Sequence, residues 1–215
     1  MNNVFGENQM YGLAKKILHK DLDPKLCAAE ILKTCNEVYP HPFWRSCKQL
    51  PFDADIQQIN TYLNRAFTHP RLAPSEKIEV IWLGLLDVSG GFTVRGSSNW
   101  SKDPEDWDWY GSDDYEFNED DPAPFMSGCL TEVMDAWTEK LTDLDNPDDM
   151  LVRIAGSFAT LVYAGGVGQH FFKTAPSNVI LGERKERWFA VGHPDSLYGI
   201  ILGRRTKSGW ETFIE

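Results

Sequence analysis

Apolar residues recur at helical spacing along the first third of the chain. The spacing predicts a helix over about residues 7–19, with its apolar positions at Met10, Leu13, Ala14, Ile17 and Leu18. A second helix is predicted to begin at Pro24, because Asp23 can cap its free N–H groups and proline is favoured at the first helical position. A third is predicted from Asp53 to His69. We therefore expect a helical N-terminal part over residues 1–70.

The pattern changes to that of strands at Ile78. Residues 78–86 are apolar at both alternating positions, which is typical of a strand buried on both faces. Ser89-Gly90-Gly91 predicts a turn into an alternating segment, so we expect a hairpin near 78–97. A three-stranded antiparallel meander is predicted over 187–214, from the segments 187–192, 197–204 and 210–214.

Two further helices are predicted between these two groups of strands. One covers residues 131–144, and the other begins at Asn146-Pro147, where asparagine can cap and proline can occupy the first turn. The pair Gly165-Gly166 is predicted to end the second of these helices, because glycine is common just after a helix terminus.

These elements define the expected fold class. Helices precede and separate the strands without strict alternation of strand and helix, which indicates an α+β fold. We expect an antiparallel sheet of about five strands, covered on one face by about five helices. The length of 215 residues and the lack of an internal repeat or linker favour a single domain over 1–215.

The composition of the chain indicates which classes of partner and which cellular location to expect. The chain has 32 acidic and 21 basic residues, a net charge of −11, which argues against nucleic acid or an anionic membrane as the partner. It carries neither an apolar run long enough to span a bilayer nor the start of a signal peptide, so a cytoplasmic location is expected. The four cysteines are too irregularly spaced for a disulfide scaffold and are expected to be reduced.

The excess negative charge is concentrated in an acidic aromatic loop over residues 101–122, named here the acidic segment. Between Lys102 and Asp121 there are ten acids and one base, a net charge of −9. Five aromatic residues lie among them, which is unusual for a merely solvated run of charge. Clustered carboxylates attract a basic protein, and tryptophan and tyrosine supply contact area. The candidate partner-binding residues are Asp103, Glu105, Asp106, Trp107, Asp108, Trp109, Tyr110, Asp113, Asp114, Tyr115 and Glu116.

Three other interpretations of the acidic segment compete with partner binding. It resembles a calcium loop at Asp106, Asp108 and Gly111, but Phe117 occupies the position where a bidentate glutamate belongs. It could supply converging carboxylates to a hydrolase or a metal-dependent enzyme. It could also contribute only solubility, as an acidic loop held to the core by its tryptophans.

Other catalytic constellations have weak support in the sequence. Cys35, His41 and Cys47 are near one another, as are His170 and His193, but neither group has the spacing of a zinc site. No catalytic residue, metal site or cofactor is therefore assigned. The expected function is that of a non-enzymatic acidic binding protein that neutralises a basic protein partner, as the immunity protein of a bacterial toxin does.

Overall fold

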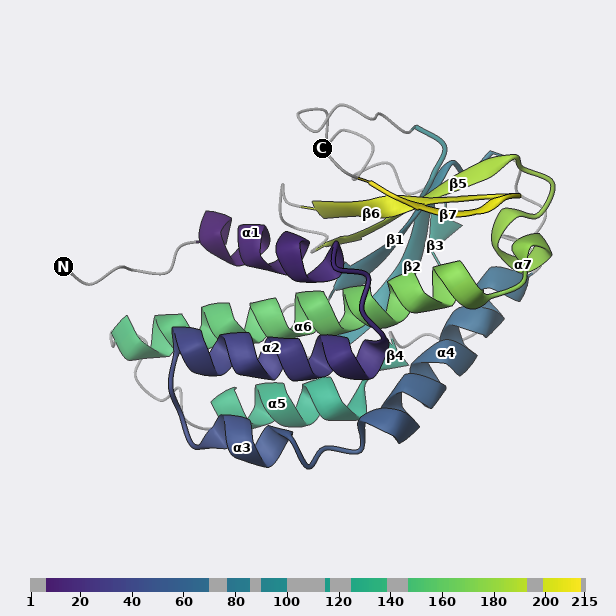
Figure 1. Cartoon of the computed structure of the whole chain (residues 1–215). Coiled ribbons are helices and arrows are strands. Elements are labelled where there is room, and N and C mark those ends of the chain that lie inside the picture. Colours follow the sequence, from purple (N-terminus) through teal and green to yellow (C-terminus); the bar gives the residue numbers. More distant parts are fainter. Residues whose placement is uncertain are drawn as a thin grey trace.

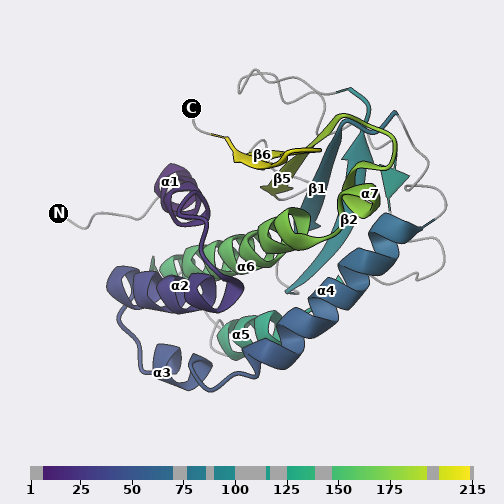
Figure 2. The same cartoon turned by 45° about the vertical axis from the view of Figure 1, so that its right-hand side comes forward.

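The computed structural model describes residues 7–69, 77–85, 90–99, 115–116, 125–138, 147–192 and 199–213. Within these ranges, seven helices and seven strands form an α+β fold (Figure 1). The helices gather on one side of the sheet, and Figure 2 shows the same two layers from a second direction. The predicted fold class is confirmed, while the prediction of a single domain over 1–215 stays a prediction.

The N-terminal helices follow the periodicity closely. Their bounds are α1 Glu7–Leu18, α2 Pro24–Val38, α3 Phe43–Cys47 and α4 Phe52–Thr68. The predicted cap of α2 is confirmed, because the Asp23 carboxylate accepts a 2.9 Å hydrogen bond from the Lys25 N–H. The short helix α3 was not predicted, since five residues between proline-rich segments carry too little periodicity.

The later helices are α5 Gly128–Thr138, α6 Pro147–Thr174 and α7 Ser177–Leu181. α5 begins before the predicted position because the Ser127 hydroxyl accepts a 3.1 Å hydrogen bond from the Leu130 N–H and so caps the helix. α6 begins at Pro147 as predicted. The predicted cap Asn146 and residues 139–144 of the predicted helix 131–144 lie outside the described residues.

The predicted end of α6 at Gly165-Gly166 is wrong, because the helix has 28 residues in all and ends at Thr174. Glycine is required at several positions inside α6 because neighbouring side chains leave no room for a Cβ atom. A Cβ at Gly166 would lie 2.6 Å from the Cys27 Sγ of α2, and one at Gly168 would lie 2.6 Å from a methyl carbon of Leu83. Among the described helices, none is long and apolar enough to cross a membrane.

The sheet contains both predicted groups of strands. The strand order is β3-β2-β1-β5-β6-β7, with β4 also paired to β2. The hairpin is formed by β1 Val80–Leu85 and β2 Gly91–Ser97, and the meander by β5 Glu186–Gly192, β6 Gly199–Thr206 and β7 Gly209–Thr212. Two short strands, β3 Tyr115–Glu116 and β4 Phe125–Met126, extend the hairpin side.

The two groups of strands join through β1 and β5, which run parallel with Val80 opposite Trp188. The other strand pairs described are antiparallel, so the sheet is mixed and mostly antiparallel. The parallel pair is possible because the chain between β1 and β5 is long and includes three helices.

Strand β1 is buried on both faces, as predicted. Leu83 points to the helical layer and Trp82 to the opposite face, and neither side chain is exposed to solvent. Trp82 packs there in a smaller cluster with Val80, Trp188, Ala190, Ile201 and Phe213. The central helix α6 contacts β1, β5, β6 and β7, so the main core lies between this helix and the sheet.

Candidate functional site

The acidic segment meets the described structure at strand β3. Of the candidate residues, Tyr115 and Glu116 form this strand, with Tyr115 opposite Gly96 and Glu116 opposite Arg95 of β2. The remaining candidates lie outside the described residues: Asp103, Glu105, Asp106, Trp107, Asp108, Trp109, Tyr110, Asp113 and Asp114. The segment is therefore joined to the sheet by the backbone pairing of β3, which is the edge strand next to β2 (Figure 1).

Arg95, which is in register with Glu116, belongs to an aromatic arrangement on the outer face of the sheet. Its guanidinium lies 5.2 Å from the centre of the Trp82 ring, and its Nε donates a 3.2 Å hydrogen bond to the Thr93 hydroxyl. A guanidinium over an indole ring is an attractive cation–π contact. These contacts hold a positive charge beside the point at which the acidic segment joins the sheet.

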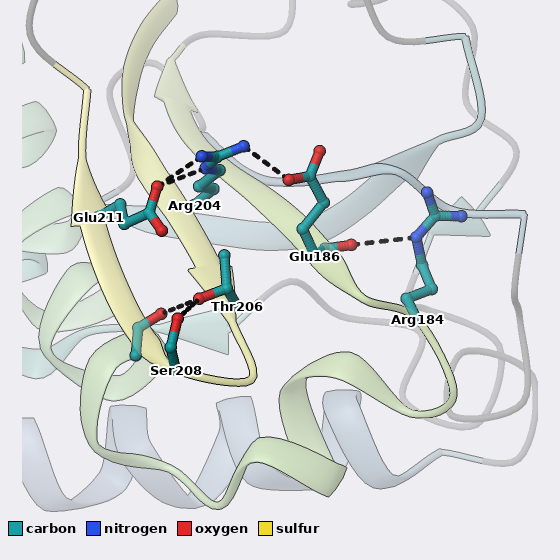
Figure 3. A network of polar contacts seen from close by, with 7 residues as sticks. Arg184, Glu186, Arg204, Thr206, Ser208 and Glu211 are labelled. Atoms are coloured by element: carbon teal, nitrogen blue, oxygen red, sulfur yellow. Dashed lines mark hydrogen bonds and ion pairs between the residues drawn. The ribbon is translucent and has the colours of Figure 1, made fainter.

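A second arginine–tryptophan pair lies across strands β5 and β6. The Arg204 guanidinium is 5.6 Å from the centre of the Trp188 ring. It also donates hydrogen bonds of 2.7 Å to Glu186 of β5 and to Glu211 of β7, as Figure 3 shows. The hydrogen bond to Glu211 raises the pKa of Arg204. One cation thus links three neighbouring strands.

Arg205, the neighbour of Arg204, turns toward the helical layer. Its guanidinium donates hydrogen bonds to the Lys173 carbonyl and to the Ser177 hydroxyl. Arg205 therefore caps the C-terminal end of α6, where a cation is favoured by the helix dipole.

All four cysteines are free thiols and are buried. Burial raises the pKa of Cys27 and of Cys129 to about 12, and it also raises the pKa of Cys35. Because the thiolate is the nucleophilic form, burial disfavours the reactive form of Cys27, Cys35 and Cys129. Their reduced state stays a prediction.

Two of the histidines considered for catalysis, His41 and His170, lie within the described residues. The His41 Nδ1 accepts a 3.2 Å hydrogen bond from the Phe43 N–H at the start of α3, while His170 lies within α6 and His193 is outside the described residues. No group of three or more His, Cys, Asp or Glu residues placed to hold a metal ion occurs in the described part of the chain.

Sequence reasoning missed a buried polar cluster around Asp55. This carboxylate is only 4% exposed and accepts hydrogen bonds from the Ser127 hydroxyl at 2.6 Å, the Gly128 N–H at 2.9 Å and the Tyr163 hydroxyl at 3.0 Å. Burial and the negative charge of Asp55 raise the pKa of Tyr163. The cluster joins α4, α5 and α6, and its hydrogen bonds are satisfied internally, so its role is structural.

Sequence reasoning also missed a pocket between α2 and the start of α4. It has a volume of about 650 Å³. Its lining residues are Lys25, Ala28, Ala29, Leu32, Lys33, Lys48, Leu50, Pro51, Phe52, Asp53 and Ala54. Three lysines around one apolar pocket are notable in so acidic a chain. The sequence signal was weak because Lys25 and Lys33 lie on α2, whereas Lys48 lies in the connection between α3 and α4.

Searches against models of protein families, curated proteins and solved structures found no match.

Proposed function

We propose that the protein is an acidic binding protein that neutralises a basic protein partner through the acidic segment, residues 101–122. The observation that carries the proposal is the distribution of charge. A net charge of −9 out of −11 falls between residues 102 and 121. Such a concentration produces a negative potential that accelerates encounter with a positively charged surface.

Two further features support partner binding. Five aromatic residues are interleaved with the acids, and aromatic side chains supply much of the binding energy at protein interfaces. Strand β3, within the segment, pairs with β2, which attaches it to the sheet. Attachment to a rigid element lowers the entropy that binding must overcome.

The mechanism that follows is occlusion. A partner that acts on a polyanion has a basic active site, and a dense cluster of carboxylates imitates that polyanion. The aromatic residues would then slow dissociation once the charges have guided the encounter. An immunity protein bound to a bacterial toxin works on this principle.

The test compares two variants with equal changes in charge. The first carries Asp106→Asn, Asp108→Asn and Asp113→Asn in the acidic segment. The control carries Glu37→Gln, Glu132→Gln and Glu183→Gln, at exposed positions elsewhere. Partners are captured from a lysate of the native host with each protein, purified and then measured for association and dissociation rates at several salt concentrations.

We expect the parent and the control to capture the same basic protein with a rate of association that falls as salt increases. The segment variant should associate about tenfold more slowly and lose most of its salt dependence, because the screened long-range attraction acts on encounter. Equal rates and equal salt slopes for both variants would show that the acidic segment is not the binding surface.

A further inference from the structure

The pocket between α2 and the start of α4 combines an apolar wall with a basic rim. Both figures show α2 and α3 on the side of the helical layer that lies away from the sheet. The pocket volume of about 650 Å³ falls within the range of about 300 to 1,000 Å³ that is typical of small-molecule sites. All of its lining residues belong to the described ranges, so the pocket does not depend on the acidic segment.

The wall is formed by apolar side chains from two directions. Ala28 and Leu32 lie one helical turn apart on α2 and are buried, with Ala29 beside them. Leu50 and Phe52, before and at the start of α4, are partly buried and pack against the main core. This wall offers apolar contact area to an aliphatic chain.

The residues at the rim of the pocket carry a net positive charge. The Lys25 ammonium lies 2.6 Å from the Asp53 carboxylate, and Lys33 lies 4.0 Å from Glu37, at the limit of an ion pair. Within the described part of the chain, Lys48 forms no ion pair or hydrogen bond through its side chain. The lining therefore holds three lysines against one aspartate.

The first turn of α4 adds to this positive potential. It begins at Phe52 with no side-chain cap, and its N–H groups point toward the N-terminal end of the helix, where an anion is favoured. This contribution is secondary to the lysines, since Asp53 and Asp55 in the same turn offset part of it.

We infer that this pocket binds a small anionic amphiphile, a carboxylate carried on an aliphatic chain. The chain would lie against Ala28, Leu32 and Leu50, while the carboxylate would pair with Lys33 and Lys48. The inference uses none of the residues of the proposed function, so either can fail without the other.

The probes differ in one property at a time. Decanoate supplies both the chain and the negative charge, decanol supplies the chain alone, decyltrimethylammonium reverses the charge, and acetate lacks the chain. Each is titrated into the 215-residue chain below its critical micelle concentration and followed by calorimetry and by NMR of the backbone amides. We expect decanoate to bind at one site with shifts confined to α2 and the start of α4. Decanol should bind about tenfold more weakly, and the other two probes should not bind measurably.

Three variants connect binding to the pocket. Lys33→Glu with Lys48→Glu should weaken decanoate binding by about tenfold or more. The control, Lys185→Glu with Lys207→Glu, changes the net charge equally at exposed positions remote from the pocket and should leave binding unchanged. Ala29→Leu should reduce binding by filling the pocket, while its exposed helical position keeps the fold intact.

The inference is wrong if decanoate does not bind, or if it binds the two charge variants equally. It is also wrong if decyltrimethylammonium binds as tightly as decanoate, because the lysines would then have no role. Circular dichroism and thermal melting of each variant confirm that a loss of binding does not reflect a loss of the fold.

Discussion

The Asp55 carboxylate of α4 accepts a 3.0 Å hydrogen bond from the Tyr163 hydroxyl of α6, across a separation of 108 residues in the sequence. The same oxygen accepts from the Ser127 hydroxyl, and the other oxygen accepts from the Gly128 N–H at the start of α5. One buried carboxylate of α4 thus connects this helix to the start of α5, through Ser127 and Gly128, and to α6, through Tyr163.

We predict that Asp55→Ala lowers the free energy of unfolding by at least about 2 kcal/mol, because it leaves buried donors without an acceptor. Tyr163→Phe should cost about 1 to 2 kcal/mol, since it removes one hydrogen bond and keeps the ring. Guanidinium unfolding of both single variants and of the double variant measures the interaction energy between Asp55 and Tyr163. Strictly additive losses would contradict a direct interaction between the two residues.

Replacing a glycine of α6 by alanine should destabilise the fold, although helix propensity alone predicts that alanine stabilises a helix. Gly168→Ala should destabilise the fold, because the added Cβ would lie 2.6 Å from Leu83 and 2.7 Å from Phe189. Gly12→Ala in α1 is the matched control, since nothing lies within 4 Å of its Cβ, and it should stabilise by up to about 1 kcal/mol. Thermal melting distinguishes them, and a stabilised Gly168→Ala variant would refute the close packing.

The cap of α2 gives a smaller, local prediction. Asp23→Ala should lower the free energy of unfolding by about 1 kcal/mol, because the Lys25 N–H loses its acceptor. Asp23→Asn should be close to the parent, since asparagine caps nearly as well. Amide hydrogen exchange in the first turn of α2 checks the location of the effect. Equal exchange in the alanine and asparagine variants would argue against the cap.

Buried thiols predict how stability depends on alkaline pH. Cys27 and Cys129 have a pKa of about 12 in the fold, against an ordinary value of 9.0. Because the folded pKa is raised, the unfolded chain loses these protons first. Stability should therefore be constant below about pH 9 and fall as the pH rises toward 12, by at most about 1.4 kcal/mol per pH unit for each thiol.

The measurement is denaturant unfolding at a series of pH values between about 8 and 11. The variant with Cys27→Ala and Cys129→Ala should show a shallower decline than the parent, whatever its absolute stability. If the two proteins decline in parallel, the thiols are not the groups responsible.

Elements whose signals are local could be located from the amino-acid sequence. Periodic apolar positions and capping residues located α1, α2 and α4, and the two runs of strand residues located the hairpin and the meander. The start of α6 at Pro147 was predictable for the same reason, because proline acts on the backbone of its own turn. The concentration of acids between residues 102 and 121 is likewise visible without a structure.

The tertiary structure decided every feature that depends on which elements are neighbours. Gly165-Gly166 looks like a helix end in the sequence, but it lies inside α6 because α1, α2 and the sheet approach that helix closely. The parallel pairing of β1 with β5 depends on the path of the intervening chain. Asp55 resembles an ordinary acidic residue of a first turn until α5 and α6 surround it. The pocket lysines line one site only because α2 and the connection before α4 pack together in the fold. Such a contact between distant parts of the chain produces no regular spacing in the sequence.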